Sequence, residues 1–359
     1  IGAISVGNRG GAIFSSGNCL IVTNGGCLFS GNIVVGTYQN AGNPAGATNL
    51  YAIDGGAAGS VVSNGAITIG NGAVGNIGDN RMTVANVGLK SGAVIIGNTS
   101  SSNTLSVFGG TRWNMQGNTV TVGNGAATNN VLRVNGGVLE NIGTLTIATN
   151  NAVELRGGTL SFANVNVNNG VVFTVGDGVL TAAVKPTRLA IFKEGLRINT
   201  NGTLGGIGIV GGGGAGVIVT NKGAVEPGVT GVGALTNAGS FTLGAGSYAR
   251  FKIATNSTAG LGWDLLVVTN GTLSLGGSIQ PMLVGDYKPF YADSFIVMSN
   301  KPPSSISNVF DNAADNGRVN VFNTNRIRTL GTFRVGISNQ YVILDSFRPY
   351  SGGMVVFVK

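Results

Sequence analysis

The sequence predicts an all-β fold, a right-handed parallel β-helix (β-solenoid) with a C-terminal β cap or small β domain. The main observation is a short apolar–polar–apolar phrase, closed by Gly-Asn or a similar pair, that recurs along the chain. Repeats of 20–27 residues with one short strand and a turn are typical of solenoids. The third residues of the five copies, spaced 27, 26, 25 and 20 positions apart, are Ile69, Ile96, Val122, Ile147 and Val167.

Composition supports the same fold class. Glycine accounts for 63 of 359 residues and supplies the positive φ angles that tight turns need. β-Branched residues dominate the apolar set, which favours strands. No long stretch has helical periodicity, and residues 308–316 are expected to form a polar turn or one short helix.

Within each copy of the phrase, the first and third residues are apolar and the middle residue is mostly polar. Successive side chains of a strand point to opposite faces, so one face is apolar in every copy. An antiparallel sandwich also has frequent short strands, but nothing in it requires the same side chains every 25 or so residues. Parallel stacking does require this, and parallel crossovers are nearly always right-handed.

A second phrase lies between the copies and indicates a further strand in each repeat. It consists of an apolar residue, one variable residue and Gly-Gly, and it begins at Val107, Val134 and Leu155. Its steps of 27 and 21 residues are in phase with the first phrase. We therefore expect at least two strands per repeat.

The regularity of the pattern divides the chain into three regions. Residues 1–60 are irregular N-terminal rungs or a cap, in which Val35 belongs to a degenerate copy of the phrase. Residues 61–262 form the parallel β-helix. Residues 263–359 are richer in aromatic residues and arginine and form the C-terminal β cap or domain, which ends in an apolar strand, Met354–Val358.

The two cysteines, Cys19 and Cys27, flank a turn-like Thr-Asn-Gly-Gly sequence. A disulfide between them would close a small loop and stabilise the fold by roughly 2–3 kcal/mol in the loop-entropy model. The alternative is a pair of buried free thiols. Two cysteines without any histidine make a metal site improbable.

Charge is sparse and unevenly distributed. Only 9% of residues are charged; residues 1–179 carry a net charge of +1 and residues 180–359 a net charge of +7. Scattered solubilising charge would explain the basic residues 180–359. The more specific alternative is a face that binds a polyanion. No Lys/Arg cluster interleaved with aromatics indicates a nucleic-acid partner. No apolar run is long enough for a membrane span, and a start without Met suits a processed secreted protein or an expression fragment.

Residues for catalysis are scarce. The absence of histidine excludes Ser-His-Asp and Cys-His catalysis and His-based metal sites, and no cofactor is predicted. Asp54 and Asp79, 25 residues apart, would stack as a carboxylate pair if they lay one repeat apart, as glycoside hydrolysis requires. The alternative is that they are isolated turn acids. Trp113 and Trp263 would either stack on sugars or pack in the interior and cap.

The region around 200–300 resembles autotransporter-associated β-strand repeats. Residues 201–212 read NGTLGGIGIVGG, close to the GTLGGTGTVGG signature of those repeats. Further along, Glu226-Pro227-Gly228 stands where members often have APG, and WDLLVV from Trp263 stands where they have YDQLVV. The resemblance implies a secreted bacterial passenger-type β-helix, often a surface or matrix component without known catalysis. Too few residues follow Trp263 for the membrane barrel that ends a full autotransporter.

The expected function is that of a secreted, non-enzymatic structural β-solenoid of a cell surface, sheath or extracellular filament. An adhesin or glycan-binding passenger is the alternative, with polysaccharide or cell envelope as partner, and a polysaccharide lyase or hydrolase ranks third. Head-to-tail self-association through the two termini is also expected, because an apolar terminal strand can add to an open sheet edge. The strand predicted to do so comprises Met354, Val355, Val356, Phe357 and Val358.

Overall fold

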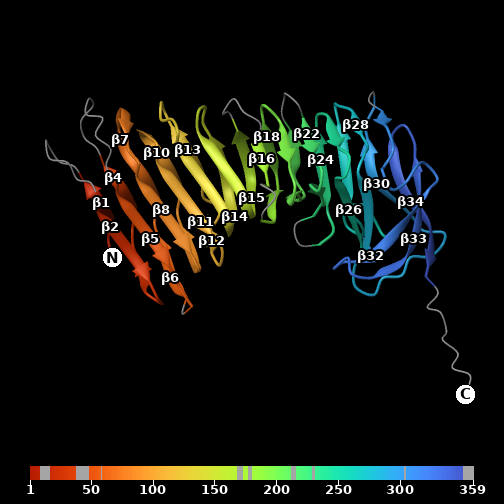
Figure 1. The fold of residues 1–359 in the computed structure, drawn as a ribbon, viewed down its shortest axis with the longest axis horizontal. Coiled ribbons are helices and arrows are strands. Elements are labelled where there is room, and N and C mark those ends of the chain that lie inside the picture. The colour runs from red at the N-terminus through yellow and green to blue at the C-terminus, as the bar shows by residue number, and fades with distance from the viewer. Residues whose placement is uncertain are drawn as a thin grey trace, which may run out of the picture. The chain divides into compact units, whose positions relative to one another are not determined.

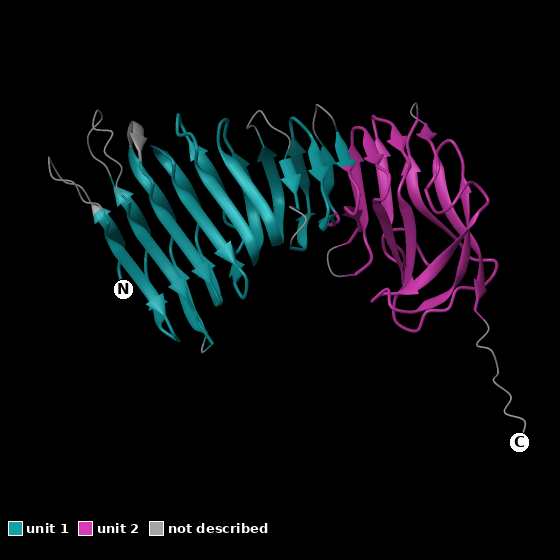
Figure 2. Ribbon diagram, viewed as in Figure 1, with its two compact units in different colours: residues 1–204, 208–218 teal, residues 205–207, 219–359 magenta. Residues whose placement is uncertain are grey.

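The computed structural model of the chain describes residues 1–8, 17–37, 48–57, 59–167, 173–176, 180–211, 216–228, 231–302 and 305–350, with the backbone alone for 73–77. These residues form strands and turns without a helix, and 34 strands join one large mixed sheet. The chain divides into two compact units, residues 1–204 with 208–218, and residues 205–207 with 219–359 (Figure 2). The prediction of an all-β protein is confirmed.

The strands of unit 1 sort into three parallel ladders, because each strand generally pairs with the strand three places further along the chain. Figure 1 shows strands of successive repeats lying side by side. Two long strands, β14 (Val131–Ile147) and β15 (Ala152–Val167), bend through all three ladders and pair with each other over nearly their whole length. The ladders are called first, second and third, in the order in which the chain enters them.

The first ladder contains the ends of β14 and β15 together with β1 (Ile4–Asn8), β4 (Ile33–Thr37), β7 (Ile67–Ile77), β10 (Val94–Ser101), β13 (Val120–Asn124), β18 (Leu189–Phe192) and β21 (Ile209–Gly211). The second contains the starts of β14 and β15 together with β2 (Cys19–Thr23), β5 (Leu50–Asp54), β8 (Arg81–Ala85), β11 (Thr104–Phe108), β16 (Phe173–Val175), β19 (Leu196–Ile198) and β22 (Val217–Val219). The third contains their middle parts with β3 (Cys27–Phe29), β6 (Ser60–Asn64), β9 (Val87–Ser91), β12 (Arg112–Asn114), β17 (Ala182–Pro186) and β20 (Gly202–Leu204).

The recurring phrase forms the first ladder in the predicted register. Its five copies pair in parallel, and the third residues stand opposite one another along the ladder. All five are buried, with exposed fractions of 2% or less. The pairing also extends toward the N-terminus through Val35 and Val6, which continue the same column. Successive side chains of a strand point to opposite faces. The first and third residues of each phrase copy therefore face the interior, and the middle residue faces outward.

The second phrase lies in the second ladder, where Val107 pairs with Val134 and Val134 with Leu155. The two phrases therefore mark two of three ladders. The third was not anticipated, because its strands share no repeated phrase. Its buried column contains side chains of different sizes, with Leu28, Val62, Leu89, Trp113 and Leu139 in register.

Unit 2 begins with parallel pairs and ends with antiparallel ones. Its parallel pairs are made by β23 (Ala224–Val225), β24 (Ala234–Ala238), β25 (Phe241–Leu243), β26 (Tyr248–Ile253), β27 (Leu265–Thr269), β28 (Leu273–Ser274), β29 (Ser278–Leu283), β30 (Ser294–Asn300), β31 (Ile306–Ser307) and β32 (Arg318–Asn323). β33 (Thr329–Ile337) pairs antiparallel with β32, and β34 (Tyr341–Pro349) with both β33 and β30. Antiparallel pairing thus replaces the repeat at the C-terminal end of unit 2.

Aromatic side chains fill the core where the antiparallel strands lie. Phe295 packs edge-on against Trp263 and Phe333, with ring centroids 5.3 and 5.7 Å apart, and Phe333 also contacts Phe347 at 5.1 Å. Phe295 and Phe333 are completely buried. The aromatic enrichment noted after residue 263 therefore belongs to a packed core. Residues 308–316 form turns and one bridge between Phe310 and Ala313, not a helix.

Candidate functional site

A buried column of asparagines runs through unit 1 immediately before the strands of the second ladder. The Nδ2 atom of each side chain donates to the Oδ1 atom of the next at 2.8–2.9 Å, and the same Oδ1 accepts the backbone N–H of the first residue. The members are Asn49, Asn80, Asn103, Asn130 and Asn151, all 4% exposed or less. Buried backbone N–H groups need hydrogen-bond partners. This column, which we call the asparagine ladder, supplies those partners at the corners where the chain turns into the second ladder.

The glycine of the recurring phrase makes room for this ladder. Gly97 and Gly123 have φ angles of 79° and 76°, in the left-handed region. A Cβ atom on either glycine would collide with the side chain of Asn130 or Asn151, respectively. The phrase therefore requires glycine for two independent reasons, a backbone angle and a close side-chain approach.

A shallow groove of about 470 Å³ lies on the outer face of the third ladder. Phe29 and Val61 line one end, and they are 57% and 55% exposed. Lys90, Asn114 and the Arg112–Glu140 pair line the other end. The groove runs across strands, from β3 to β14, so each of several repeats contributes outward-facing side chains to it.

Charge in the groove is mostly positive. Arg112 donates from Nε and one terminal nitrogen to the two carboxylate oxygens of Glu140, at 2.7 and 3.0 Å. The Arg112 side chain is 75% exposed and that of Glu140 is 18% exposed. Lys90 is exposed, and it has no ion pair with any residue that the structure describes. The groove thus holds two cations and one carboxylate.

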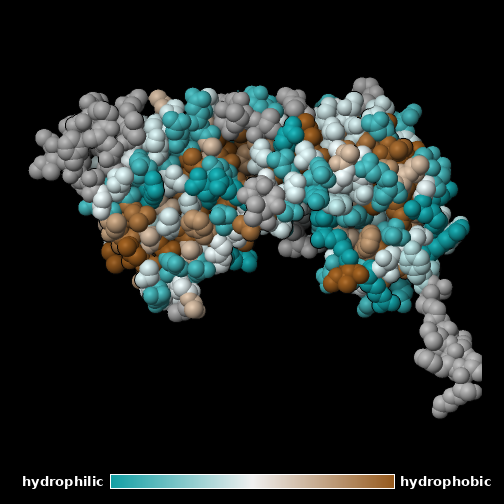
Figure 3. Space-filling view, viewed as in Figure 1, coloured by the Kyte–Doolittle hydropathy of each residue, from teal (hydrophilic) through white to brown (hydrophobic). Residues whose placement is uncertain are grey.

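The first strands of unit 1 form an edge with exposed apolar side chains. Within the described residues, β1, β2 and β3 each pair on one side only, with β4, β5 and β6. Ile21 of β2 is 59% exposed, and Phe29 of β3 lies on the same edge. Figure 3 shows an apolar area at the start of unit 1, near β2. Such an edge presents hydrogen-bonding groups to another strand.

Cys19 and Cys27 lie on this edge, each as the first residue of its strand. Both are free, exposed thiols, and each Sγ lies near the carbonyl oxygen of the glycine two residues earlier. Neither cysteine is buried, so the expectation of buried free thiols is wrong. The disulfide between them is not formed in the structure and stays a prediction.

Asp54 and Asp79 do not form a carboxylate pair, because Asp54 stands opposite Ala85 in the ladder. Asp54 accepts bonds from the Asn86 side chain and the Gly56 backbone, both at 3.0 Å. The Asn86 side chain holds the pKa of Asp54 below its usual value, with a smaller contribution from the Gly56 amide. Asp79 pairs with Arg81 at 3.3 Å. Asp54 ends β5 and is bound by Asn86 of the next repeat, whereas Asp79 has a partner two residues away. The expectation of a stacked carboxylate pair is therefore wrong.

The two tryptophans are packing residues. Trp113 is completely buried, and its indole nitrogen donates to Ser91 Oγ at 2.9 Å. Trp263 donates to the backbone oxygen of Ile296 at 2.8 Å and packs against Phe295. Neither indole ring forms part of the groove.

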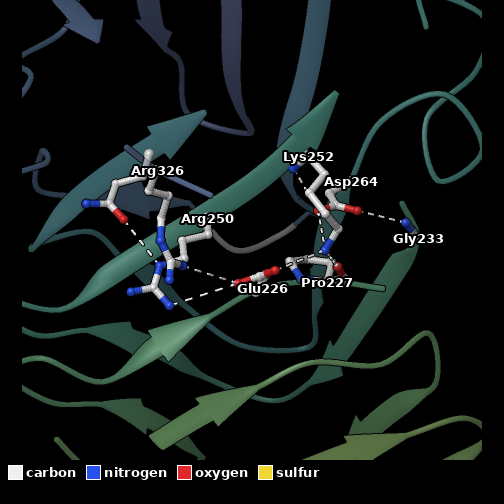
Figure 4. Close-up of polar contacts among 8 residues, drawn as sticks. Glu226, Pro227, Gly233, Arg250, Lys252, Asp264 and Arg326 are labelled. Atoms are coloured by element: carbon white, nitrogen blue, oxygen red, sulfur yellow. Dashed lines mark hydrogen bonds and ion pairs between the residues drawn. The ribbon is translucent and has the colours of Figure 1, made fainter. Parts of the chain in front are cut away.

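Unit 2 contains a network of charged residues around Glu226 and Asp264 (Figure 4). The carboxylate of Asp264 accepts the backbone N–H groups of Gly233 and Lys252, both at 2.8 Å. Lys252 Nζ lies 3.2 Å from Asp264 and 3.4 Å from Glu226, and it donates to the carbonyl of Pro227 at 2.7 Å. These are the Glu-Pro-Gly and Trp-Asp positions that carry the family resemblance, brought together from distant parts of the sequence.

Two arginines complete the network. Arg250 and Arg326 each place a terminal nitrogen 3.9 Å from a Glu226 carboxylate oxygen, and Arg250 donates to Gln280 at 3.2 Å. Burial lowers the pKa of Arg250, and the nearby Arg326 cation lowers it further. Burial also raises the pKa of the fully buried Asp264 to about 7, against the opposing effect of Lys252. The network ties the loop before β24 to β23 and β26, which is a structural role.

Sequence reasoning did not find the asparagine ladder, although a signal was present. Asn80, Asn103, Asn130 and Asn151 each precede a strand and are separated by 23, 27 and 21 residues. Those steps match the repeat. The groove left no comparable signal, because its side chains come from strands without a common phrase.

The comparisons with known proteins identify no relative: no protein-family model, curated protein or solved structure matches the chain. The described residues include no helix that could cross a membrane. They also include no group of three or more potential metal-binding side chains. The predicted assembly residues Met354, Val355, Val356, Phe357 and Val358 lie outside the described residues.

Proposed function

We propose that the chain is a right-handed parallel β-helix and serves as a secreted structural solenoid of a bacterial cell surface, sheath or extracellular filament. The three parallel ladders of unit 1 support the β-helix, because the chain returns to the same ladder with every third strand. The right-handed sense follows from the strong preference of parallel crossovers. The resemblance to autotransporter-associated repeats supports secretion and a structural role.

One observation carries the structural role: in the described part of unit 1, the same buried contacts recur from repeat to repeat. An apolar column and the asparagine ladder both continue from repeat to repeat. In such arrays stability is built from contacts between neighbouring repeats, so length increases without a new core. Each of the two carboxylates considered for catalysis is bound by a separate protein side chain, Asp54 by Asn86 and Asp79 by Arg81. We therefore assign the chain no enzymatic activity.

Head-to-tail self-association is the mode of assembly that we propose. The edge formed by β1, β2 and β3 is the acceptor, and the apolar segment 354–358 of another copy is the added strand. Main-chain hydrogen bonds would give affinity, and the exposed side chain of Ile21 in β2 would be covered. Because one end of a copy would bind the other end of the next, the contact would not close and would form a filament.

The test compares the intact chain with a chain lacking residues 354–359, by sedimentation velocity and negative-stain imaging at increasing concentration. The intact chain should form filaments, and the shortened chain should remain folded and monomeric. Ile21→Lys should also abolish filaments, because a charge on an edge strand opposes strand addition. Ile327→Lys is the matched control at another exposed isoleucine and should leave assembly unchanged. Filaments from the shortened chain, or an intact chain that stays monomeric, would refute the proposal.

A further inference from the structure

Position 88, in the floor of the groove, holds a glycine although neither the backbone angle nor the neighbouring atoms require one. Gly88 is the second residue of β9 (Val87–Ser91), its φ is not in the left-handed region, and a Cβ atom added to it would meet nothing within 4 Å. Glycine weakens a strand interior, and there it often marks a place where a ligand approaches the backbone. In its outward column Gly88 stands between Val61 and Arg112, so its missing side chain opens the floor of the groove.

The two ends of the groove differ in chemistry. Phe29 and Val61 offer an exposed aromatic ring and an aliphatic surface at one end. At the other end, Lys90 and Asn114, which stand opposite each other in neighbouring strands, offer an ammonium and an amide group. A pyranose ring has apolar C–H faces and a rim of hydroxyl groups, so it matches this combination of surfaces.

The dimensions of the groove suit a chain better than a single sugar. It crosses five neighbouring strands of the third ladder, β3, β6, β9, β12 and β14. Neighbouring strands are about 4.8 Å apart, which gives a length of roughly 19 Å. An extended oligosaccharide laid across the strands would contact all five.

The charges favour an acidic ligand. Glu140 is bound by Arg112 through both carboxylate oxygens, and Lys90 remains as a cation without an ion-pair partner among the described residues. A sugar carboxylate could form a charge-assisted hydrogen bond with Lys90, which is stronger than a neutral one. A neutral glycan would leave this attraction unused.

We propose that the groove over Phe29, Gly88 and Lys90 binds an acidic polysaccharide, one that contains uronic acid residues. The bound chain lies across the strands, with a sugar ring against Phe29 and a carboxylate at Lys90. This site goes beyond the structural role and does not depend on self-association, because all its residues come from one copy.

The experiment is isothermal titration calorimetry of the full chain with a hexamer of galacturonic acid, and with maltohexaose as the neutral sugar. The acidic hexamer should bind more tightly, and its affinity should fall as salt is added. The titration is done at protein concentrations where sedimentation shows a monomer. Failure of sugar binding is thereby separated from failure of assembly.

Gly88→Leu fills the floor of the groove and should abolish binding of both sugars. Gly109→Leu is its matched control, since Gly109 is exposed, lies outside the groove and has nothing within 4 Å of an added Cβ. Lys90→Gln should weaken binding of the acidic hexamer roughly five- to tenfold and leave maltohexaose unaffected. Lys301→Gln, at an exposed lysine elsewhere, should change neither. Circular dichroism establishes that each variant is folded.

Three outcomes would overturn the proposal. One is that no hexamer binds at millimolar concentration. Another is binding that Gly88→Leu leaves intact, which would place the sugar elsewhere. The third is that Gly88→Leu alters the sedimentation of the protein without affecting sugar binding, which would make the groove a contact between copies.

Discussion

At the scale of single residues, stability depends on what faces the interior of each repeat. Ile96 is completely buried and stands in register between Ile69 and Val122. The residues beside them on the other face, such as Thr121, are only partly buried. The same strand therefore contains positions of very different sensitivity.

The first prediction concerns this difference. Ile96→Ala should lower the free energy of unfolding by roughly 2–4 kcal/mol, because it removes buried surface and leaves a cavity between two neighbouring repeats. Thr121→Ala, its control one strand along the ladder, should cost less than about 0.5 kcal/mol. Urea denaturation measures both. A larger loss for Thr121→Ala would mean that the faces are assigned the wrong way round.

The second prediction concerns the asparagine ladder. Asn103→Ala removes the acceptor of the Asn80 backbone and side-chain N–H groups and the donor to Asn130. The partners left behind, Asn80 and Asn130, are fully buried, so stability should fall by about 2–4 kcal/mol.

Asn124→Ala is the control for this prediction, because Asn124 makes a similar side-chain bond to Asn98 at 2.7 Å in an exposed position. Its loss should cost less than about 1 kcal/mol, since water can take the place of the lost amide. Equal effects of the two substitutions in urea denaturation would contradict the role given to burial.

At the scale of elements, the strands of the first ladder are coupled to the corners that precede the second ladder. The strands β1, β4, β7, β10 and β13 each contain a glycine with a positive φ angle. A Cβ atom on any of these glycines would collide with a buried member of the asparagine ladder. A substitution at such a glycine should therefore disturb both the strand and the corner.

The third prediction follows from this coupling. Gly97→Ala should destabilise the protein by roughly 2 kcal/mol or more, because alanine disfavours a positive φ and its Cβ would displace Asn130. Gly88→Ala, in an extended strand with open space, should cost nothing or stabilise slightly by restricting the unfolded chain. Thermal and urea unfolding of the two variants provide the comparison. A similar loss of unfolding free energy in both variants would show that neither the positive φ nor the contact with Asn130 makes Gly97 more sensitive than Gly88.

At the scale of the whole molecule, the two units gain stability in different ways. Unit 1 repeats one set of interior contacts, whereas unit 2 adds an aromatic core and a network of charged residues. Asp264 is the most deeply buried charged group of that network, and burial raises its pKa from 3.8 to about 7. Stability should therefore vary with pH in a way specific to unit 2.

The fourth prediction gives the sign of that variation. Below pH 3.8 Asp264 is protonated in both the folded and the unfolded chain, so its contribution is constant. Between pH 3.8 and about 7 the unfolded chain has lost the proton that the folded chain still holds. The free energy of unfolding contributed by Asp264 should therefore fall as pH rises through this window, by up to about 1.4 kcal/mol per pH unit.

Asp264→Asn, which does not titrate, provides the reference. The stability difference between the intact chain and this variant, from urea denaturation on both sides of the window, should decrease with rising pH. A difference independent of pH would show that Asp264 titrates near its ordinary value in the folded chain. Carbon NMR of the carboxylate would report its midpoint directly.

The all-β class, the inward-facing residues of the first ladder and the register of the five phrase copies could all be predicted from the sequence. This was possible because side-chain alternation and a constant repeat are local properties, and parallel stacking turns them directly into contacts. The second phrase likewise placed Val107, Val134 and Leu155 in one ladder.

The contacts between polar side chains could not be predicted from the sequence and became apparent in the structure. Asp54 and Asp79 have a suitable spacing, yet repeats of unequal length place them at different positions. Asp264, Lys252 and Glu226 come together from three strands or loops, and the groove draws side chains from five strands. Such contacts depend on the register between strands and on the length of every intervening turn. A local pattern does not contain that information, because it records only which face of its own strand a residue occupies.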